Sequence, residues 1–360
     1  MAIFNRLVTK AAVSPAPAKA AASGGSVNQA LASYYNFTEG EARNRCMSVP
    51  TISRARDLIA SVIGCMSLQM YNEMWNGDSM EKMPLAPRSW LRRIDPAVPN
   101  NFILSWTFDD LFFYGRSMWY ITSRTADGFP ASFQRLPMGS ISTTDMTGPV
   151  WFGPSKEIYF NGNQLDAANV VQFLSPIQGI TSMSTQSVGT ALKLEAARYR
   201  NSASSIPAGV LKQTGGEPLS GQELADLASA FNAARATNQT AALNEYLTYT
   251  ETATSPDKML LIDSAEFQAK EMARICNVPF YLVGCDVGSY SYVSNDGARA
   301  DLWTFGAKAY AECITSTLSQ NNVLPNGTYV EFDYEDYLQN EYATPQMPDM
   351  ATPMGVTSPS

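Results

Sequence analysis

Apolar residues recur at helical spacing in two stretches near the end of the chain, on either side of a polar segment. The first stretch places four apolar residues on one face of a helix: Ala265, Ala269, Met272 and Ile275. Residues Asp263–Glu266 have the form of a capping box, so we predict that this helix begins at Asp263. We predict that it ends before Pro279, because the residue preceding a proline disfavours the α conformation.

The polar segment and the second helical pattern come next. After a short apolar run, residues 280–284, the segment 285–295 reads CDVGSYSYVSN and contains two tyrosines and no positive charge. From about Asp296 toward Leu318, apolar residues form two adjacent stripes, which predicts a helix that packs on two sides. The stripes are Leu302, Phe305, Ala309 and Cys313, and Trp303, Tyr310 and Ile314.

The first half of the chain mixes helix and strand patterns. Residues 58–70 are apolar, but a membrane helix needs about 20 such residues, so we predict a core helix and no membrane association. Residues 102–114 also have helical spacing. Strands are predicted for residues 118–124, 131–136, 157–160 and 169–174, with a hairpin turn at Asp127-Gly128. These elements predict an α+β block.

A small module follows a helix predicted for residues 188–200. Strand-like composition occurs at residues 208–213, 245–250 and 258–262, and Gly215-Gly216 indicates a turn. A second capping box, Ser220–Glu223, precedes a helical set of apolar residues: Leu224, Leu227, Ala228 and Phe231. A module of about fifty residues is marginally stable alone, so we predict that neighbouring copies of the chain stabilise it.

Two groups of carboxylates are candidate metal or acid–base sites. Asp109 and Asp110 are adjacent on a predicted helix, where neighbouring side chains point about 100° apart, so we predict that they face solvent or another subunit rather than one ion. After a turn at residues 324–327, residues 329–334 alternate as a strand. Its acidic residues lack the glycine and spacing of an EF-hand, which favours an acidic sheet face. These residues are Glu331, Asp333 and Glu335.

Several enzyme classes are excluded by composition. The chain has no histidine, which removes Ser-His-Asp and Cys-His catalysis and all histidine-containing zinc sites. It also lacks a GxxxxGK[ST] phosphate loop, a GxGxxG turn and a CxxC pair. Its five cysteines are scattered and indicate reduced thiols. We therefore predict no catalytic residue, no metal and no cofactor.

The net charge and the composition of the two chain ends give further indications. The net charge of -8 disfavours a protein that coats nucleic acid, because such proteins carry basic patches. Residues 1–32 are rich in Ala, Ser and Pro and carry only basic charges, like a transit peptide. They have no continuous apolar core, so we predict a disordered arm. The last residues, 339–360, form a Pro-, Met- and Thr-rich tail.

The order of these motifs resembles the portal proteins of tailed double-stranded DNA bacteriophages, in the branch with short, capsid-embedded portals. In that family a helix ends in Val-Pro and an apolar run ending in Gly, as in residues 278–284, and a polar loop with a Tyr and Ser-Asn element, as in residues 292–295, leads to a long helix. Residues 49–71 resemble the first wing helix of the family. Residues 111–120 resemble its helix-to-strand step, with Arg116-Ser117 where Asn-Ala is frequent.

The resemblance implies an α+β portal fold with a wing, a helical stem, a small α/β clip and a long helix after the tunnel loop. It covers residues 45 to 336. A helical crown is predicted to be short or absent, because the tail stands where portals usually continue into a crown. The implied division is 1–32 arm, 33–187 wing, 188–205 first stem helix, 206–262 clip, 263–280 second stem helix, 281–296 tunnel loop, 297–322 long wing helix, 323–338 wing return strand and 339–360 tail.

The function implied by the resemblance is mechanical. Copies of the chain form a ring, usually a dodecamer, at one capsid vertex, through which double-stranded DNA is packaged and ejected. Implied partners are the major capsid protein, the large terminase and the head-to-tail connector; the implied location is the virion, after assembly in the host cytoplasm. The implied channel residues are Asp286, Gly288, Ser289, Tyr290, Ser291, Tyr292, Ser294 and Asn295. A tail or baseplate structural protein and a carboxylate-dependent enzyme are the alternatives.

Overall fold

A computed structural model describes residues 41–143, 153–203, 209–236, 246–251, 261–285, 295–334 and 337. Its helices, after a helical turn at 41–47, are α2 Pro50–Cys65, α3 Ser89–Arg92, α4 Asn100–Tyr114, α5 Ile180–Met183, α6 Thr185–Ala203, α7 Gly221–Ala236, α8 Leu261–Ile275, α9 Asn295–Asp301 and α10 Lys308–Leu318. Short helical segments are η1 Met138–Ser140, η2 Ala167–Asn169, η3 Phe280–Val283 and the π-helix η4 Leu302–Ala307. None of the described helices is long and apolar enough to span a bilayer.

The strands form small antiparallel sheets, in agreement with the predicted α+β class. They are β1 Leu68–Trp75, β2 Met80–Pro84, β3 Arg116–Arg124, β4 Pro130–Leu136, β5 Ile141–Thr143, β6 Ile158–Phe160, β7 Asn163–Leu165, β8 Val170–Leu174, β9 Gly209–Gln213, β10 Leu247–Glu251 and β11 Thr328–Phe332. The sheet orders are β11-β1-β2, β4-β3-β8, β5-β6-β7 and β10-β9. Strands distant in sequence are therefore neighbours, since β1 pairs with β11 and β3 with β8.

Helix α4 and strand β3 form the centre of the main body. Helix α4 is apolar around most of its circumference, and it packs against α2 on one side and β3 on another. The fully buried Trp119 of β3 lies 4.7 Å from the ring of Phe173 and donates a 2.9 Å hydrogen bond to Thr107 of α4. Trp119 therefore buries a large aromatic ring with its indole N–H bonded, and it joins helix α4 to the sheet in one core.

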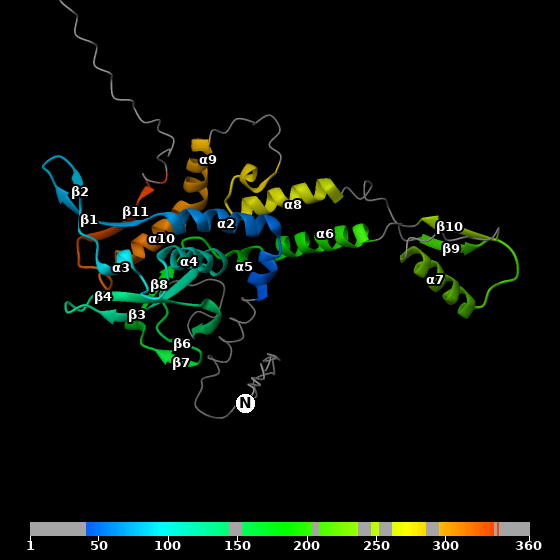
Figure 1. The fold of residues 1–360 in the computed structure, drawn as a ribbon, viewed down its shortest axis with the longest axis horizontal. Helices are drawn as coiled ribbons and strands as arrows, with labels where there is room; N and C mark the ends of the chain where they lie inside the picture. The colour runs from blue at the N-terminus through cyan, green and yellow to red at the C-terminus, as the bar shows by residue number, and fades with distance from the viewer. Residues whose placement is uncertain are drawn as a thin grey trace, which may run out of the picture.

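Helices α6 and α8 lead from this body to a separate small module. Figure 1 shows the two helices side by side, with α7, β9 and β10 at the far end of the longest axis. We call these three elements the clip module. Its α7 begins with the predicted capping box, because Ser220 N–H donates to the Glu223 carboxylate at 2.8 Å and the Glu223 N–H returns to Ser220 Oγ at 3.4 Å. The predicted strands 208–213 and 245–250 correspond to β9 and β10, with Ala208 and Glu245 outside the described residues.

Two predictions near α2 and α8 are wrong. A helix is expected for residues 49–71, and a core helix for residues 58–70. The observed helix α2 ends at Cys65, and residues from Leu68 onward pair with β11 instead. The strand pairing overrides the helical spacing, because Met70 is buried between the exposed Gln69 and the half-buried Tyr71 and pairs with Val330 across the sheet. The strand predicted at 258–262 is helical at Leu261 and Ile262, and its first residues lie outside the described part of the chain.

Helix α8 does not start at Asp263, so the capping box predicted there is also wrong. Asp263 lies in the first turn of a helix that already includes Leu261, and Glu266 forms an ion pair with Lys270, one turn further on. The helix ends as predicted before Pro279, but Asn277 ends it by adopting a left-handed conformation with φ 53°. The Val278 N–H then reaches the Ala273 carbonyl at 3.0 Å, which closes a Schellman motif.

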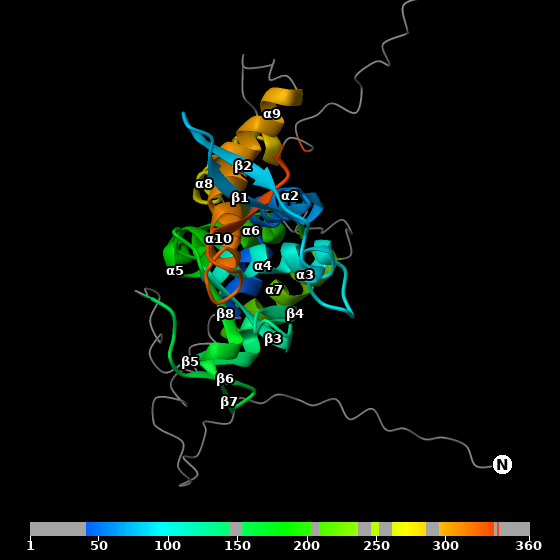
Figure 2. The ribbon, with the colours of Figure 1, turned by 90° about the vertical axis from the view of Figure 1, so that its left-hand side faces the viewer.

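The long helix after residue 295 is interrupted by the π-helix η4. The extra residue in each π turn rotates the following face, so the predicted stripe fails at Phe305, which is 63% exposed. Leu302 and Cys313 of that stripe are buried, as are Tyr310 and Ile314 of the other. In Figures 1 and 2, α9 projects from the body, whereas α10 lies within it.

Candidate functional site

Most of the predicted channel residues lie outside the described residues. These are Asp286, Gly288, Ser289, Tyr290, Ser291, Tyr292 and Ser294. Asn295 is the first residue of α9. The structure therefore describes the two ends of the predicted tunnel loop, which are η3 with Cys285 on one side and α9 on the other.

The end before the loop is fixed to the body. Leu282 and Val283 of η3 are partly buried against the core, and η3 packs on α8 and α2. Gly284 then takes a left-handed conformation with φ 86°, and the Cys285 N–H donates to the Phe280 carbonyl at 3.2 Å. The backbone is thus fixed to the body as far as residue 285.

The other end is tied back to the same place by one polar contact. The Tyr281 hydroxyl of η3 donates a 2.9 Å hydrogen bond to Asp301, the last residue of α9. Partial burial, this hydrogen bond and the negative charge of Asp301 together raise the pKa of Tyr281 to about 12, so the hydroxyl remains a donor at neutral pH. No sequence motif indicates this pair, because its two residues are twenty positions apart.

Two positive charges on α8, before the loop, are paired with neighbouring acids. On α8, Lys270 pairs with Glu266 at 2.6 Å and Arg274 pairs with Glu271. Between Arg274 and Arg299 the sequence contains no lysine or arginine. The site therefore has polar and aromatic chemistry, with no row of cations that would bind phosphates tightly.

The acidic pair on α4 is buried, so the predicted solvent-facing or intersubunit location is wrong. Asp109 is 1% exposed and accepts hydrogen bonds from Arg43 at 2.9 and 3.0 Å and from Arg56 at 2.8 Å. All three of its contacts come from arginines distant in sequence. The two arginines balance the charge that burial would otherwise leave isolated.

Asp110 is buried in the same way by different partners. It accepts two hydrogen bonds from Arg135, at 2.7 and 2.8 Å, and one from Ser117 at 2.9 Å. Desolvation raises its pKa to about 6, although Arg135 favours the ionised form. Three guanidinium groups, those of Arg43, Arg56 and Arg135, lie 5.2–5.5 Å from the ring of Trp106. Both carboxylates are therefore engaged in hydrogen bonds within the fold, and the pair has a structural role.

The negative charge predicted on one face of β11 is partly balanced by neighbouring side chains. Glu331 forms an ion pair with Lys82 of β2, and Asp333 accepts a hydrogen bond from Gln69 of β1. Glu335 lies outside the described residues. Among the described residues there is no group of three or more metal-ligating side chains.

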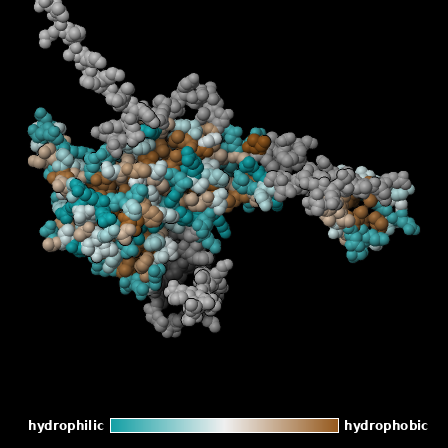
Figure 3. All heavy atoms as spheres, in the orientation of Figure 1, coloured by the Kyte–Doolittle hydropathy of each residue, from teal (hydrophilic) through white to brown (hydrophobic). Residues whose placement is uncertain are grey.

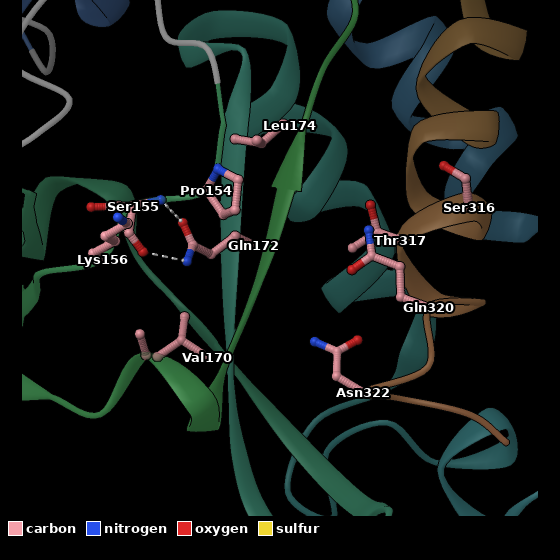
Figure 4. A pocket seen from close by; sticks show the side chains of 11 residues that line it. Pro154, Ser155, Lys156, Val170, Gln172, Leu174, Ser316, Thr317, Gln320 and Asn322 are labelled. Atoms are coloured by element: carbon pink, nitrogen blue, oxygen red, sulfur yellow. Dashed lines mark hydrogen bonds between the residues drawn. The ribbon is translucent and has the colours of Figure 1, made fainter. Parts of the chain in front are cut away.

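A groove of about 570 Å³ lies between β8 and the end of α10 (Figure 4). The Gln172 amide crosses part of it and pairs with the Ser155 backbone, accepting from its N–H at 2.7 Å and donating to its carbonyl at 2.9 Å. The remaining polar lining consists of hydroxyl and amide side chains with one cation, Lys156. No carboxylate lines this groove, so it offers none of the acid–base pairs that a carboxylate-dependent enzyme needs.

The five cysteines carry no disulfide. Cys46, Cys276 and Cys313 are buried, Cys285 is partly buried and Cys65 is exposed. Burial raises the pKa of Cys46 to about 11 and of Cys313 to about 12, which keeps them protonated and unreactive.

The chain resembles known proteins both in its sequence family and in its fold. The model of a family described as "Phage portal protein" matches residues 50–349. No curated protein sequence is significantly similar to the chain. An HK97-family phage portal protein from Corynebacterium diphtheriae has a similar structure, with a TM-score of 0.65 and 20% identity over 81% of this chain and 95% of that one.

Two further structures of this fold come from gene transfer agent particles. A chain in the virion of the native particle has a TM-score of 0.57 and 14% identity, covering 82% of this chain and 84% of that one. A chain in the neck of the native particle, computed with C12 symmetry, has the same TM-score and identity over 83% and 84%. These likenesses show a shared fold, the portal fold predicted from the order of motifs.

Proposed function

This chain belongs to the phage portal protein family, and from that membership we propose that its copies form a closed ring at one capsid vertex, with a channel for DNA. Portal proteins are structural components, and we propose no catalytic role for this one. We further propose a dodecamer that contacts the major capsid protein through the wing and binds the large terminase and later the connector through the clip. Assembly in the host cytoplasm precedes incorporation into the virion.

The observation that carries the ring proposal is apolar surface left open on the stem helices and the clip module. On the stem, Tyr199 of α6 is 74% exposed, and Ile262 and Phe267 of α8 are 76% and 57% exposed. In the clip module, Val210, Leu224 and Tyr246 are also exposed. Figure 3 shows hydrophobic residues at the end of α8 and on the clip module. Slender parts of this kind bury their apolar residues when neighbouring copies cover them, and a head-to-tail interface that closes yields a ring.

We predict that the purified chain forms rings. We also predict that negative charges introduced on the stem helix α8 prevent ring formation. Ile262→Glu combined with Phe267→Glu places two charges in the proposed interface, where each lacks a partner, and the mass measured by light scattering should fall to that of one chain. Negative-stain images of the unchanged chain should show rings with a central hole.

The control for this experiment is Met74→Glu, on the β1–β2 hairpin, because Met74 is 55% exposed but lies outside stem and clip. This variant should retain rings. A strictly monomeric unchanged chain with a cooperative melt, at all concentrations and salt conditions, contradicts the ring proposal.

We propose that residues 286–295 line the channel. Support comes from their position between the fixed end at Cys285 and the projecting α9, and from the absence of lysine and arginine between Arg274 and Arg299. A duplex must slide past these residues, and each phosphate-binding cation would add affinity and therefore resistance. Hydroxyl and amide groups of Ser289, Ser291 and Asn295 form weaker, exchangeable contacts with phosphates.

Added positive charge at this segment should impair DNA packaging. Ser291→Lys or Tyr292→Arg would place one new cation per copy around the duplex, which increases phosphate binding and slows translocation. We expect intact rings but several-fold less nuclease-protected DNA per particle. Ser79→Lys, which adds the same charge at the exposed tip of the β1–β2 hairpin, should package normally. Normal packaging by both segment variants rules out the channel assignment.

A further inference from the structure

Helix α9 has few contacts that could hold it in a fixed direction. It has seven residues, which is shorter than the length at which an isolated helix is stable in water. Among the described elements, its extensive packing is with η4, the π-helix that continues it. Figures 1 and 2 both show it projecting from the body. Contacts at its base therefore help to set its direction.

Apolar packing holds the chain at the base of α9 from residue 302 onward. Leu302 is 6% exposed, and Gly306 approaches Ile59 of α2 so closely that an added Cβ would lie 3.4 Å from its side chain. A π-helix is a point at which a helix can change direction, because its hydrogen-bond ladder is irregular there. Packing of η4 on α2 therefore fixes α10 but leaves the angle of α9 open.

Beyond that packing, one hydrogen bond reaches α9 itself and one ring contact reaches η4 beside it. The Tyr281 hydroxyl of η3 donates to Asp301, at the junction of α9 and η4, at 2.9 Å. Trp303, two residues later, stacks on Tyr334 with ring centroids 4.8 Å apart and planes 26° apart. Both Tyr281 and Asp301 are partly buried, so water competes only partly for this hydrogen bond.

We propose that Tyr281 is a positioning residue whose hydrogen bond to Asp301 sets the direction of α9 relative to the body. Because η3 is packed on α8 and α2, the contact connects the projecting helix α9 to the core of the body. It also keeps residue 301 beside residue 281, and so brings together the chain on either side of residues 286–294. The consequence for DNA passage rests on the proposed channel function, whereas the anchoring itself does not.

Hydrogen exchange on the full-length chain tests this inference. Tyr281→Phe removes only the donor oxygen, and exchange of backbone amides in peptides covering residues 295–306 should become about tenfold faster, as expected when one hydrogen bond to a charged group is lost. Exchange in peptides covering 308–318 should remain unchanged, because α10 is held by other contacts. Tyr329→Phe, the same change on β11, should leave both regions as they are.

The acceptor side provides the second variant. Asp301→Ala should reproduce the effect of Tyr281→Phe, and the double variant should add little to either, because the two changes remove the same contact. Unchanged exchange in 295–306, or an equal increase in 308–318 with a lower melting temperature, overturns the proposal. If exchange behaves as expected but Tyr281→Phe particles package DNA normally, the anchoring is correct and its link to the channel fails.

Discussion

Asp109→Ala is expected to lower the free energy of unfolding by about 3 kcal/mol. The carboxylate is 1% exposed and is the shared acceptor for Arg43 and Arg56. Its removal leaves two guanidinium groups in a partly buried site without their counter-charge. Their side chains are 19% and 15% exposed, so they retain some contact with water, and the loss falls at the lower end of the range for a broken buried pair.

Chemical denaturation with urea measures this loss, and the structure offers a matched control. Asp57 also contacts Arg56, at 2.8 Å, but its side chain is 59% exposed. Asp57→Ala should therefore cost less than about 1 kcal/mol, as exposed ion pairs do. Equal effects of the two substitutions would mean that burial of Asp109 does not determine its contribution to stability.

The acidic pair shows what the sequence could not predict. Helical spacing correctly places Asp109 and Asp110 on a helix, and the geometry of adjacent residues correctly argues against one shared ion. Their burial depends on three arginines that arrive from residue 43, from α2 and from β4. Contacts between residues 25 to 66 positions apart leave no periodic pattern, so a charged pair on a helix is interpreted as exposed unless its partners are known.

Local signals predicted local structure well. The hairpin β3–β4, the capping box at Ser220 and the stop before Pro279 each depend on residues within a few positions of one another. One error arose where a distant contact decides, in β1, whose strand conformation depends on pairing with β11. The capping box predicted at Asp263 failed although its signal is local, because the helix already includes Leu261. No sequence pattern indicated the π-helix η4 either. Helical spacing assumes regular α-helical turns, so it did not predict the exposure of Phe305 that results from the extra residue per turn.

For the candidate site, the structure describes the elements that flank residues 286–294. The order of motifs placed the channel segment between two helices, and the structure describes elements of the expected kind at both ends. The roles of residues 286–294 remain proposals. The contact that ties the two ends, Tyr281 with Asp301, is a long-range hydrogen bond and could be found only in three dimensions.

Gly179→Ala is expected to destabilise the chain by about 2–3 kcal/mol, although its backbone conformation is ordinary. Gly179 precedes α5, and an added Cβ would lie 2.2 Å from the Phe113 carbonyl oxygen and 2.6 Å from the Tyr114 carbonyl carbon. Both are backbone atoms at the end of α4, so they cannot move aside as a flexible side chain can. The Thr181 hydroxyl also donates to the Phe113 carbonyl at 2.7 Å, and the clash would break this contact.

The matched control is Gly189→Ala in α6, where nothing lies within 4 Å of the added Cβ. Alanine favours a helix interior, so this variant should be more stable by about 0.5–1 kcal/mol. Opposite shifts in the urea midpoint, with similar slopes, are therefore expected for one chemical change at two glycines ten residues apart. Because α5 leads directly into α6, displacement at Gly179 should also tilt the stem helix and weaken ring formation in light scattering. A Gly179→Ala chain as stable as the unchanged one would mean that the end of α4 and the start of α5 can separate without loss.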